Sequence, residues 1–358
     1  AIVEPKSYSE TLLTMLASPN FASKAWVYEQ YDHMVQTNTV IAPGLGAAMI
    51  RLKGTEKALA MTTDGNSGYA LLNPYFGGAI AVAEAARNLA CIGAKPVGMT
   101  NCLNFGNPER PETMWSFGLA VEGMADACTR FEIPVVSGNV SLYNETLGLG
   151  IYPTPIVGMV GVIDTPDLIR RPLTPGFKAA GEKIVLIGDT REELGGSAYL
   201  KIIHSQERGY PPNLDFEKEK GVQMLVREAA QAGLLTAAHD CAEGGLTMTL
   251  AECCLLSPAH VGGKVTISPP AIRTDGFLFG ESQSRIVVTV KPADFDTLQS
   301  RIEAQGLPYT VLGETGGTAL EISIQDHPHP LIHLSLDAMN TSYKTGLSDY
   351  FKDRTGSE

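Results

Sequence analysis

The apolar positions of this chain change along its length between helical spacing and the short apolar runs that are typical of buried strands. At the beginning, LLTML and WVYEQY supply an apolar face that predicts a helix over 11–34. The pattern then predicts strands at 38–51 and 57–63, a helix at 77–93, a strand at 95–103, a helix at 111–130, and strands at 133–140 and 155–163. These elements indicate a first domain in which helices cover a sheet.

A second group of elements follows residues 164–182, where three prolines and the absence of periodicity predict a domain boundary. The predicted order is a strand at 183–189, helices at 195–204 and 219–234, a strand at 236–240, a helix at 244–256, strands near 264–268 and 285–290, a helix at 292–305, strands at 309–314 and 319–324, and a helix around 336–350.

We therefore expect an α/β (α+β) chain with two domains. The expected divisions are a linker and leading helix at 1–36, a sheet domain at 37–165, a linker at 166–182, an α/β domain at 183–350 and a tail at 351–358.

Charge and composition exclude several classes of protein. The chain has 27 Lys and Arg against 39 Asp and Glu, and its net charge of −12 repels nucleic acid. The sequence contains no long uncharged apolar run, and it therefore does not suggest a membrane as partner. The six cysteines form no C-x-x-C pair, which favours reduced thiols and a cytoplasmic enzyme. The seven histidines are scattered and do not favour a zinc site.

The first candidate for chemistry is Asp64, which ends an apolar strand and precedes a Gly-Asn-Ser loop. A carboxylate in this position suits Mg²⁺, which takes hard oxygen ligands and bridges to substrate phosphates. The alternative is an Asx turn, in which Asp64 caps its own loop. The sequence leaves both open.

Two further loops follow predicted strands of the same domain. One carries Gly138, Asn139 and Ser141: the glycine would let a phosphate approach main-chain N–H groups, the amide could ligate a metal, and the hydroxyl could bind substrate. The other begins with Asn101 and contains three asparagines. Each loop alone has the pattern of a turn, but three polar loops at neighbouring strand ends would form a site.

In the second domain, two glycine-rich segments begin predicted helices, where free N–H groups favour anions. The first segment contains Gly195, Gly196 and Ser197, and the second contains Gly244 and Gly245. The plain alternative for the first is an N-cap, because the ending of a P-loop is missing.

Asp240 ends the strand before the second glycine-rich segment and repeats the arrangement at Asp64; its alternative role is that of a capping acid. Glu281, Ser282 and Gln283 precede a strand and could hold a substrate amide or hydroxyl, with Arg285 nearby for a phosphate. The alternative is the solvated shoulder of a hairpin.

No residue in these loops is an evident catalytic base, and no serine or cysteine nucleophile motif is present. His239 lies on an apolar strand, where a core role is the commoner one. The residues alone thus predict a two-domain α/β protein with a cleft suited to phosphate and Mg²⁺.

Several segments in a fixed order resemble one enzyme family. They are WVYEQYDHMVQTNTV, TTDGNSGY, NPYFGGAIAVAEAARN, LNFGNPERPE, SGNVSLYNE, HDCAEGGL and FGESQSR. Over roughly 11–345 the chain resembles the carboxyl-terminal half of phosphoribosylformylglycinamidine synthase, within the superfamily of aminoimidazole ribonucleotide synthetase. The resemblance implies an amino-terminal domain that pairs into a shared β-barrel and a carboxyl-terminal α/β domain.

The resemblance also implies the reaction: ATP- and Mg²⁺-dependent amidation of formylglycinamide ribonucleotide to the amidine in purine biosynthesis, with ammonia from a glutaminase. The implied partners are a first module, the glutaminase subunit, a small accessory subunit and, through the barrel edge, a second copy. By the same resemblance Gly138, Asn139 and Ser141 reach across to ATP, metal and substrate in the other module's site, and Asn101 contacts ATP in place of an expected aspartate.

The resemblance further implies that this module's own cleft is a pseudo-site. Asp64 matches a metal-binding carboxylate, whereas Asn66 and Gly68 stand where the active half has a catalytic histidine and an arginine. By pseudo-symmetry Asp240 matches a metal position, and Glu281, Ser282 and Gln283 match substrate positions. No catalytic residue is assigned to this chain, which is expected to be inactive without the first module. The alternatives are a non-catalytic nucleotide-binding module and a complete homodimeric enzyme such as aminoimidazole ribonucleotide synthetase.

Overall fold

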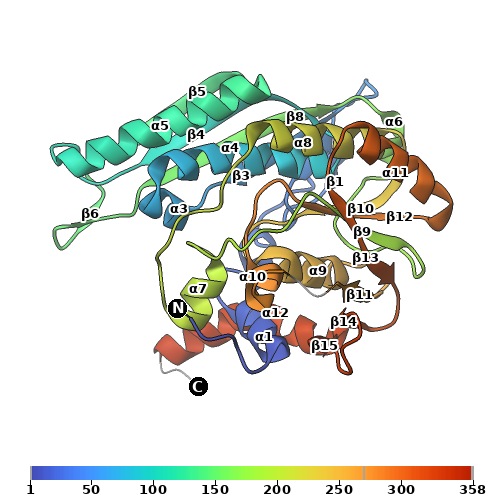
Figure 1. Cartoon of the computed structure of the whole chain (residues 1–358). Coiled ribbons are helices and arrows are strands. Elements are labelled where there is room, and N and C mark those ends of the chain that lie inside the picture. Colours follow the sequence, from blue (N-terminus) through green and yellow to red (C-terminus); the bar gives the residue numbers. More distant parts are fainter. Residues whose placement is uncertain (1, 269–270, 356–358) are drawn as a thin grey trace.

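The computed structural model describes residues 2–268 and 271–355 (Figure 1). Its first sheet has six strands in the order β1-β2-β3-β8-β4-β5, and only β4 and β5 pair in parallel. The strands are β1 (Thr39–Ile41), β2 (Ala48–Arg51), β3 (Ala58–Asp64), β4 (Lys95–Asn104), β5 (Val135–Ser141) and β8 (Thr154–Ile163). A two-stranded ribbon, β6 (Glu145–Thr146) and β7 (Leu149–Gly150), extends from its end.

The single leading helix predicted over 11–34 is wrong. Helix α1 (Tyr8–Ala17) starts at the N-cap Ser7, whose side chain accepts a hydrogen bond from the Glu10 amide. It stops at Ser18 because that residue precedes Pro19, which disfavours the helical conformation, and Ser18 is extended. A short helix α2 (Ala25–Tyr28) and a 3₁₀ turn η1 (Val35–Thr37) follow.

One face of the first sheet is covered by α4 (Pro74–Cys91) and α5 (Pro111–Phe131), with a short α3 (Ser67–Leu72) before them. The two long helices approach closely because of glycine. A Cβ at Gly78 would lie 2.3 Å from the Ala120 carbonyl oxygen, and one at Gly123 would lie 2.0 Å from that of Tyr75. No helix of the described residues covers the opposite face (Figure 1).

The second sheet has seven strands in the order β10-β12-β9-β13-β11-β14-β15, antiparallel except for β11 with β14. They are β9 (Lys183–Ile187), β10 (Leu235–Asp240), β11 (Gly263–Ile267), β12 (Ile286–Val290), β13 (Tyr309–Thr315), β14 (Ala319–Ile324) and β15 (Ile332–Ser335). Its helices are α7 (Ala198–His204), α8 (Phe216–Gln231), α9 (Gly245–Leu255), α10 (Thr274–Phe279), α11 (Phe295–Ala304) and α12 (Leu336–Thr355), with a 3₁₀ turn η2 (Pro292–Asp294).

The two domains share a hydrophobic core. Helix α8 of the second domain packs against α4 and α5 of the first, and one continuous cluster of buried residues runs from Met99 on β4 through Val222 on α8 to Val288 on β12. A separate cluster fills the other face of the second sheet, beneath α1, α9 and α12. Figure 1 shows α8 near α4, and α1, α9 and α12 together on the other side of the second domain. The interface between the domains is therefore buried.

The predicted linker contains a short helix, α6 (Pro166–Arg170), and otherwise lacks regular structure up to β9. Helix α12 continues to Thr355, into the range of the predicted tail, and residues 356–358 lie outside the described part. Within the described residues, no helix is long and apolar enough to cross a bilayer.

Candidate functional site

A cavity of about 470 Å³ lies between the two domains. Its walls come from loops after β1, β3 and β10, from α4 and α9, and from the segment after α1. Five carboxyl groups line it, and among the described residues no lysine or arginine does: Asp64, Glu84, Asp240, Glu243 and Glu252. The walls are thus rich in carboxyl groups.

Asp64 leaves the end of β3 and points toward α4. Its Oδ2 accepts a hydrogen bond of 3.0 Å from Asn88 Nδ2, and its Oδ1 accepts one of 2.9 Å from the Gly65 amide. The second bond is to the next residue, whereas an Asx turn uses the amide two residues on, and the place of Asp64 in the cavity keeps the metal role open. Burial, and then the charge of Asp240, raise the pKa of Asp64 to about 8.

Asp240 ends β10 on the facing domain. Its Oδ1 lies 3.4 Å from Nδ1 of His239, whose Nε2 lies 2.8 Å from Oε2 of Glu252 on α9. Burial alone would raise the pKa of Asp240, but His239 and the charge of Arg87 lower it. Burial would lower the pKa of His239, yet its two carboxylate partners raise it to about 10. His239 is therefore not an isolated core histidine.

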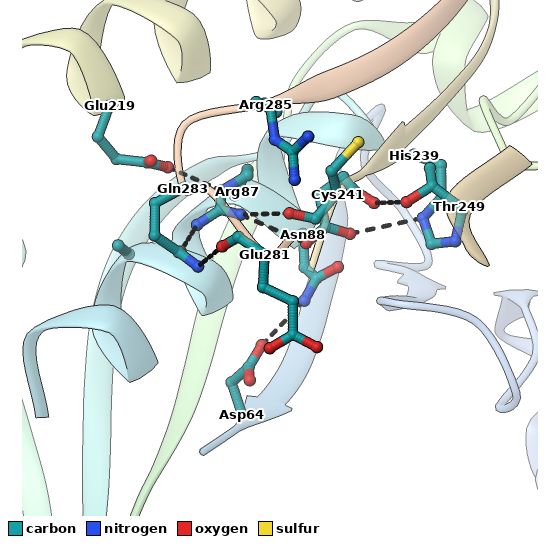
Figure 2. A network of polar contacts seen from close by, with 12 residues as sticks. Asp64, Arg87, Asn88, Glu219, His239, Cys241, Thr249, Glu281, Gln283 and Arg285 are labelled. Atoms are coloured by element: carbon teal, nitrogen blue, oxygen red, sulfur yellow. Dashed lines mark hydrogen bonds and ion pairs between the residues drawn. The ribbon is translucent and has the colours of Figure 1, made fainter. Parts of the chain in front are cut away.

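Arg87 on α4 connects the cavity wall to the second domain (Figure 2). This fully buried side chain donates to Glu219 Oε1 at 2.9 Å, to Gln283 Oε1 at 2.6 Å and to the Cys241 carbonyl at 3.3 Å. One of its nitrogens also lies 3.8 Å from Asp240 Oδ2. All of these partners belong to the second domain, so Arg87 fixes the position of the two domains.

The residues predicted to hold substrate have internal roles. Glu281 is fully buried; its Oε1 accepts from the amides of Ala198 at 2.9 Å and Gly244 at 2.7 Å, and its Oε2 accepts from the Tyr69 hydroxyl. Burial, then the charge of Glu243, raise its pKa to about 8. The alternative prediction, that residues 281–285 form the solvated shoulder of a hairpin, is wrong because all five residues are buried.

The two residues after Glu281 are also engaged. Ser282 Oγ accepts from the Arg191 amide at 3.0 Å, and Gln283 Nε2 donates to the Glu281 carbonyl at 3.0 Å. The prediction that Arg285 is available to bind a phosphate is wrong. Its buried guanidinium donates hydrogen bonds to the Ser282 and Gly280 carbonyls and to the Thr190 hydroxyl. A substrate contact from these side chains would require internal hydrogen bonds to break.

Most of the glycine and serine residues predicted to hold a phosphate do not line a cavity. Ser197 is the N-cap of α7, as the plain alternative had it, and accepts from the Leu200 amide. Gly195 packs so that a Cβ would lie 2.0 Å from the Tyr210 carbonyl oxygen, and Gly244 donates its amide to Glu281. Gly245 begins α9 with a φ of +65°. Of the five, Gly196 lines a second, smaller chamber of about 180 Å³.

The second chamber adjoins the first. Asn20, Gly65, Asn66 and Glu243 line both. Between them Asn66 Nδ2 donates a 2.6 Å hydrogen bond to Glu243 Oε1, while Asn66 Oδ1 caps α3 through the Tyr69 amide. Gly68 lines the second chamber, and a Cβ there would lie 3.2 Å from Asn66 Oδ1.

The predicted residues of β4 and β5 do not line either chamber. Asp64 and Asn101 pair with the same residue of β8, Val157, from opposite sides, and Gly138 pairs with Asn101, so all three occupy one row of the sheet. A Cβ at Gly138 would lie 2.2 Å from Asn101 Oδ1. The glycine thus makes room for the carboxamide, which corrects the expectation that a phosphate fills this space.

Asn139 and Ser141 pair with alternate residues of β4, so their side chains lie on the opposite face of the sheet, the one without helices. That face bears an apolar groove of about 390 Å³ whose walls include Val97, Val136 and Val160. The predicted site residues are therefore divided between the interdomain cavity and the uncovered face of the first sheet.

The donor set of the cavity fits Mg²⁺ in part. Among the described residues, no three His, Cys, Asp or Glu side chains form a ready metal site. Asp240 Oδ2 nevertheless is buried without a hydrogen-bond partner, and Asp64 faces the same cavity. Two carboxylates suit Mg²⁺ when water and phosphate oxygens complete its shell. Asn139 cannot share this site, since it lies on the other face.

The sequence reading missed Glu84, Arg87, Glu219 and Glu252. All four lie inside helices, where a charge normally indicates a solvated face, yet Arg87 and Glu219 are fully buried and Glu84 and Glu252 are partly buried. Glu84 and Arg87 are three residues apart on α4, within a run of alanines, and this was the available signal.

Comparisons with known proteins agree with this architecture. The model of the "AIR synthase related protein, N-terminal domain" matches residues 44–163, and that of the "C-terminal domain" matches residues 179–324. Among solved structures, PurL of Thermotoga maritima complexed with FGAR is similar in fold, with a TM-score of 0.75 at 18% identity over 94% of this chain and 54% of that chain.

Curated relatives are more similar in sequence. The phosphoribosylformylglycinamidine synthase subunit PurL of Moorella thermoacetica is 50% identical over 344 residues, which are 96% of this chain and 46% of the relative. The subunit of the same name from Alkaliphilus metalliredigens is 48% identical over 90% of this chain and 43% of its own length. The chain thus spans about half the length of the curated relatives it matches.

Proposed function

This chain belongs to the family of AIR synthase related proteins, and we propose that it provides the second module of a phosphoribosylformylglycinamidine synthase. The observation that carries the proposal is the 50% identity to PurL over nearly the whole chain but less than half of the relative. The whole enzyme would use ATP and ammonia to convert formylglycinamide ribonucleotide to its amidine, and related PurL structures hold FGAR and ATP.

In this proposal the interdomain cavity holds ADP or ATP with Mg²⁺. Asp64 and Asp240 would ligate the ion, which would neutralise part of the phosphate charge. Lys201, which lines the adjoining second chamber, would add a positive charge for a phosphate. No residue of the cavity is assigned to proton transfer, so the module's own site would bind nucleotide without turning it over.

The uncovered face of the first sheet is the proposed contact with a first module. Val136 is 71% exposed and Val97 44% exposed, which is unusual for valines on a sheet face. Asn139 and Ser141 lie on this face, so a partner seated here would bring its own ATP, metal and substrate against these two residues, whereas Asn101 belongs to the other face. A glutaminase and a small accessory subunit would supply ammonia to the assembly.

A second copy of the chain is the competing occupant of this face, in a homodimer that resembles aminoimidazole ribonucleotide synthetase. The same apolar surface favours it. A cytoplasmic location is part of either proposal, because all six cysteines are unpaired, as expected in a reducing compartment.

Calorimetry with ADP tests the cavity assignment. Wild type should bind ADP in the presence of Mg²⁺ and not in the presence of EDTA. The isosteric variants Asp64→Asn and Asp240→Asn should bind at least about tenfold more weakly. Asp167→Asn, an exposed carboxylate on α6, is the matched control and should bind as wild type does. Equal affinity in all four proteins would remove the cavity from the proposal and leave a scaffold.

A further inference from the structure

Residues 18–28, here named the strap, border the interdomain cavity between α1 and the first sheet. Asn20 lines both chambers and is exposed, and Phe21 lines the larger one. Because an exposed residue that lines a cavity stands at its rim, the strap forms part of the cavity's entrance.

The strap is held to the second domain by two contacts. The Ser23 amide donates a 2.8 Å hydrogen bond to the carbonyl of Tyr343 on α12. The ring of Phe21 lies over Gly244, where a Cβ would come within 3.0 Å of the Phe21 Cζ. Gly244 has a φ of +78° and leads into α9, so this anchor sits directly at the cavity wall.

The other end of the strap is held by the first domain. The Tyr28 hydroxyl lies against Gly44 so closely that a Cβ there would be 2.5 Å from it. Gly44 has a φ of +105° and lines the cavity. The strap therefore joins the two walls of the cavity across its entrance.

The strap also brings a positive charge to an acidic entrance. Lys24 Nζ donates to the carbonyls of Ala22 at 2.5 Å and Asn20 at 3.1 Å, which holds it within the strap. Burial lowers the pKa of Lys24, and the charges of Glu243 and Glu252 act against that shift. Two of the five carboxylates of the cavity thus interact with the strap as well as with each other.

We propose that the strap is a lid, which opens to admit a magnesium-bound nucleotide and closes over it. This inference rests on the proposed function, since it needs a ligand to enclose. The contacts that close the lid include one main-chain hydrogen bond, two aromatic anchors and the buried side chain of Ala22, whereas Lys24 and Trp26 of the same segment are exposed. A surface segment of this kind opens at a lower cost than global unfolding.

Limited trypsin digestion of the full chain measures the opening. Cleavage after Lys24 requires the strap to leave its anchors, whereas Lys53, in the exposed turn between β2 and β3, reports on general susceptibility. With ADP and Mg²⁺ near a hundredfold excess over the dissociation constant, cleavage after Lys24 should slow by roughly tenfold or more, and cleavage after Lys53 should not change.

Two variants loosen one anchor each: Phe21→Ala and Tyr28→Ala. Without ligand, each should be cut after Lys24 several times faster than wild type. Val27→Ala, also on the strap but 45% exposed and outside both chambers, is the matched control and should be cut at the wild-type rate.

Calorimetry on the same samples separates the two ways to fail. If ADP and Mg²⁺ bind while cleavage after Lys24 is unchanged, the lid is refuted and the proposed function stands. If loosening either anchor leaves the rate unchanged, the contacts described above do not close the strap, and the proposal is overturned. If no nucleotide binds, the proposed function fails, and the lid fails with it.

Discussion

The substitution Arg87→Met removes the guanidinium that connects the two domains while retaining most of the side chain's volume. In wild type this group satisfies Glu219, Gln283 and a main-chain carbonyl, and all of them are buried. Without it, Glu219 keeps only the Gln223 amide at 2.8 Å, and its Oε2 has no hydrogen-bond partner even in wild type. The variant therefore leaves a buried carboxylate without a counter-charge.

The expected loss is about 3–5 kcal/mol of unfolding free energy, which is the usual cost of removing one partner of a buried ion pair. The fully buried geometry, with the Nε–Oε1 distance of 2.9 Å, places this pair at the upper end of the range. Removing the other charge as well, in Arg87→Met with Glu219→Gln, should recover at least half of the loss, since no uncompensated charge then remains.

Urea unfolding, followed by circular dichroism, measures both variants against wild type. The matched control is Arg130→Met. Arg130 also pairs a helix of the first domain with α8, through Glu217 at 3.5 Å, but both side chains are mostly exposed. It should lose no more than about 1 kcal/mol. A loss below 1 kcal/mol for Arg87→Met, or a double variant less stable than the single, would contradict the reasoning.

Three other predictions concern packing, protonation and association. Gly123→Ala should destabilise by about 2 kcal/mol or more in thermal unfolding, because its Cβ meets a backbone carbonyl, whereas Gly118→Ala on the same helix, with open space, should stabilise slightly; equal effects would contradict the close helix contact. Because the pKa of Asp64 is raised to about 8, its protonated form stabilises the fold at low pH, and that contribution is lost as pH rises from about 4 to about 8. Without Mg²⁺, the unfolding free energy of Asp64→Asn should therefore rise by at least about 1 kcal/mol relative to wild type between those two pH values. A difference between the two proteins that does not change with pH would refute the raised pKa. Val136→Glu should abolish any self-association seen by light scattering, and a dimer that survives it does not use the uncovered sheet face.

Much of the fold could be predicted because apolar periodicity acts locally. The alanine-rich α4, the amphipathic α5 and α8, and the apolar β9 and β12 coincide closely with the predicted ranges. The leading helix was wrong because WVYEQY has helical spacing but stands after Ser18 and Pro19, and a local break decided the outcome against the pattern. The pairing of β8 with β3 on one side and β4 on the other depends on contacts between residues far apart in the sequence, and apolar periodicity carries no information about such contacts.

The candidate site was predicted in part. Asp64 and Asp240 do face one cavity, because a carboxylate directly after an apolar strand is placed at the sheet's edge. Glu281 could not be distinguished from a substrate ligand, since a buried acid that accepts from two helix amides has the same sequence context as an exposed one. Arg87 was missed because only tertiary packing makes a helical charge a buried one.

The most direct test of the account is an assay of ammonia-dependent amidation. Formylglycinamide ribonucleotide, ATP, Mg²⁺ and ammonia are supplied to this chain alone, and to this chain mixed with the separately produced first half of the PurL of Moorella thermoacetica. The account predicts no turnover by the chain alone and measurable turnover once light scattering shows that the two halves have assembled. Robust turnover by the chain alone, or an assembled pair without activity, would contradict it.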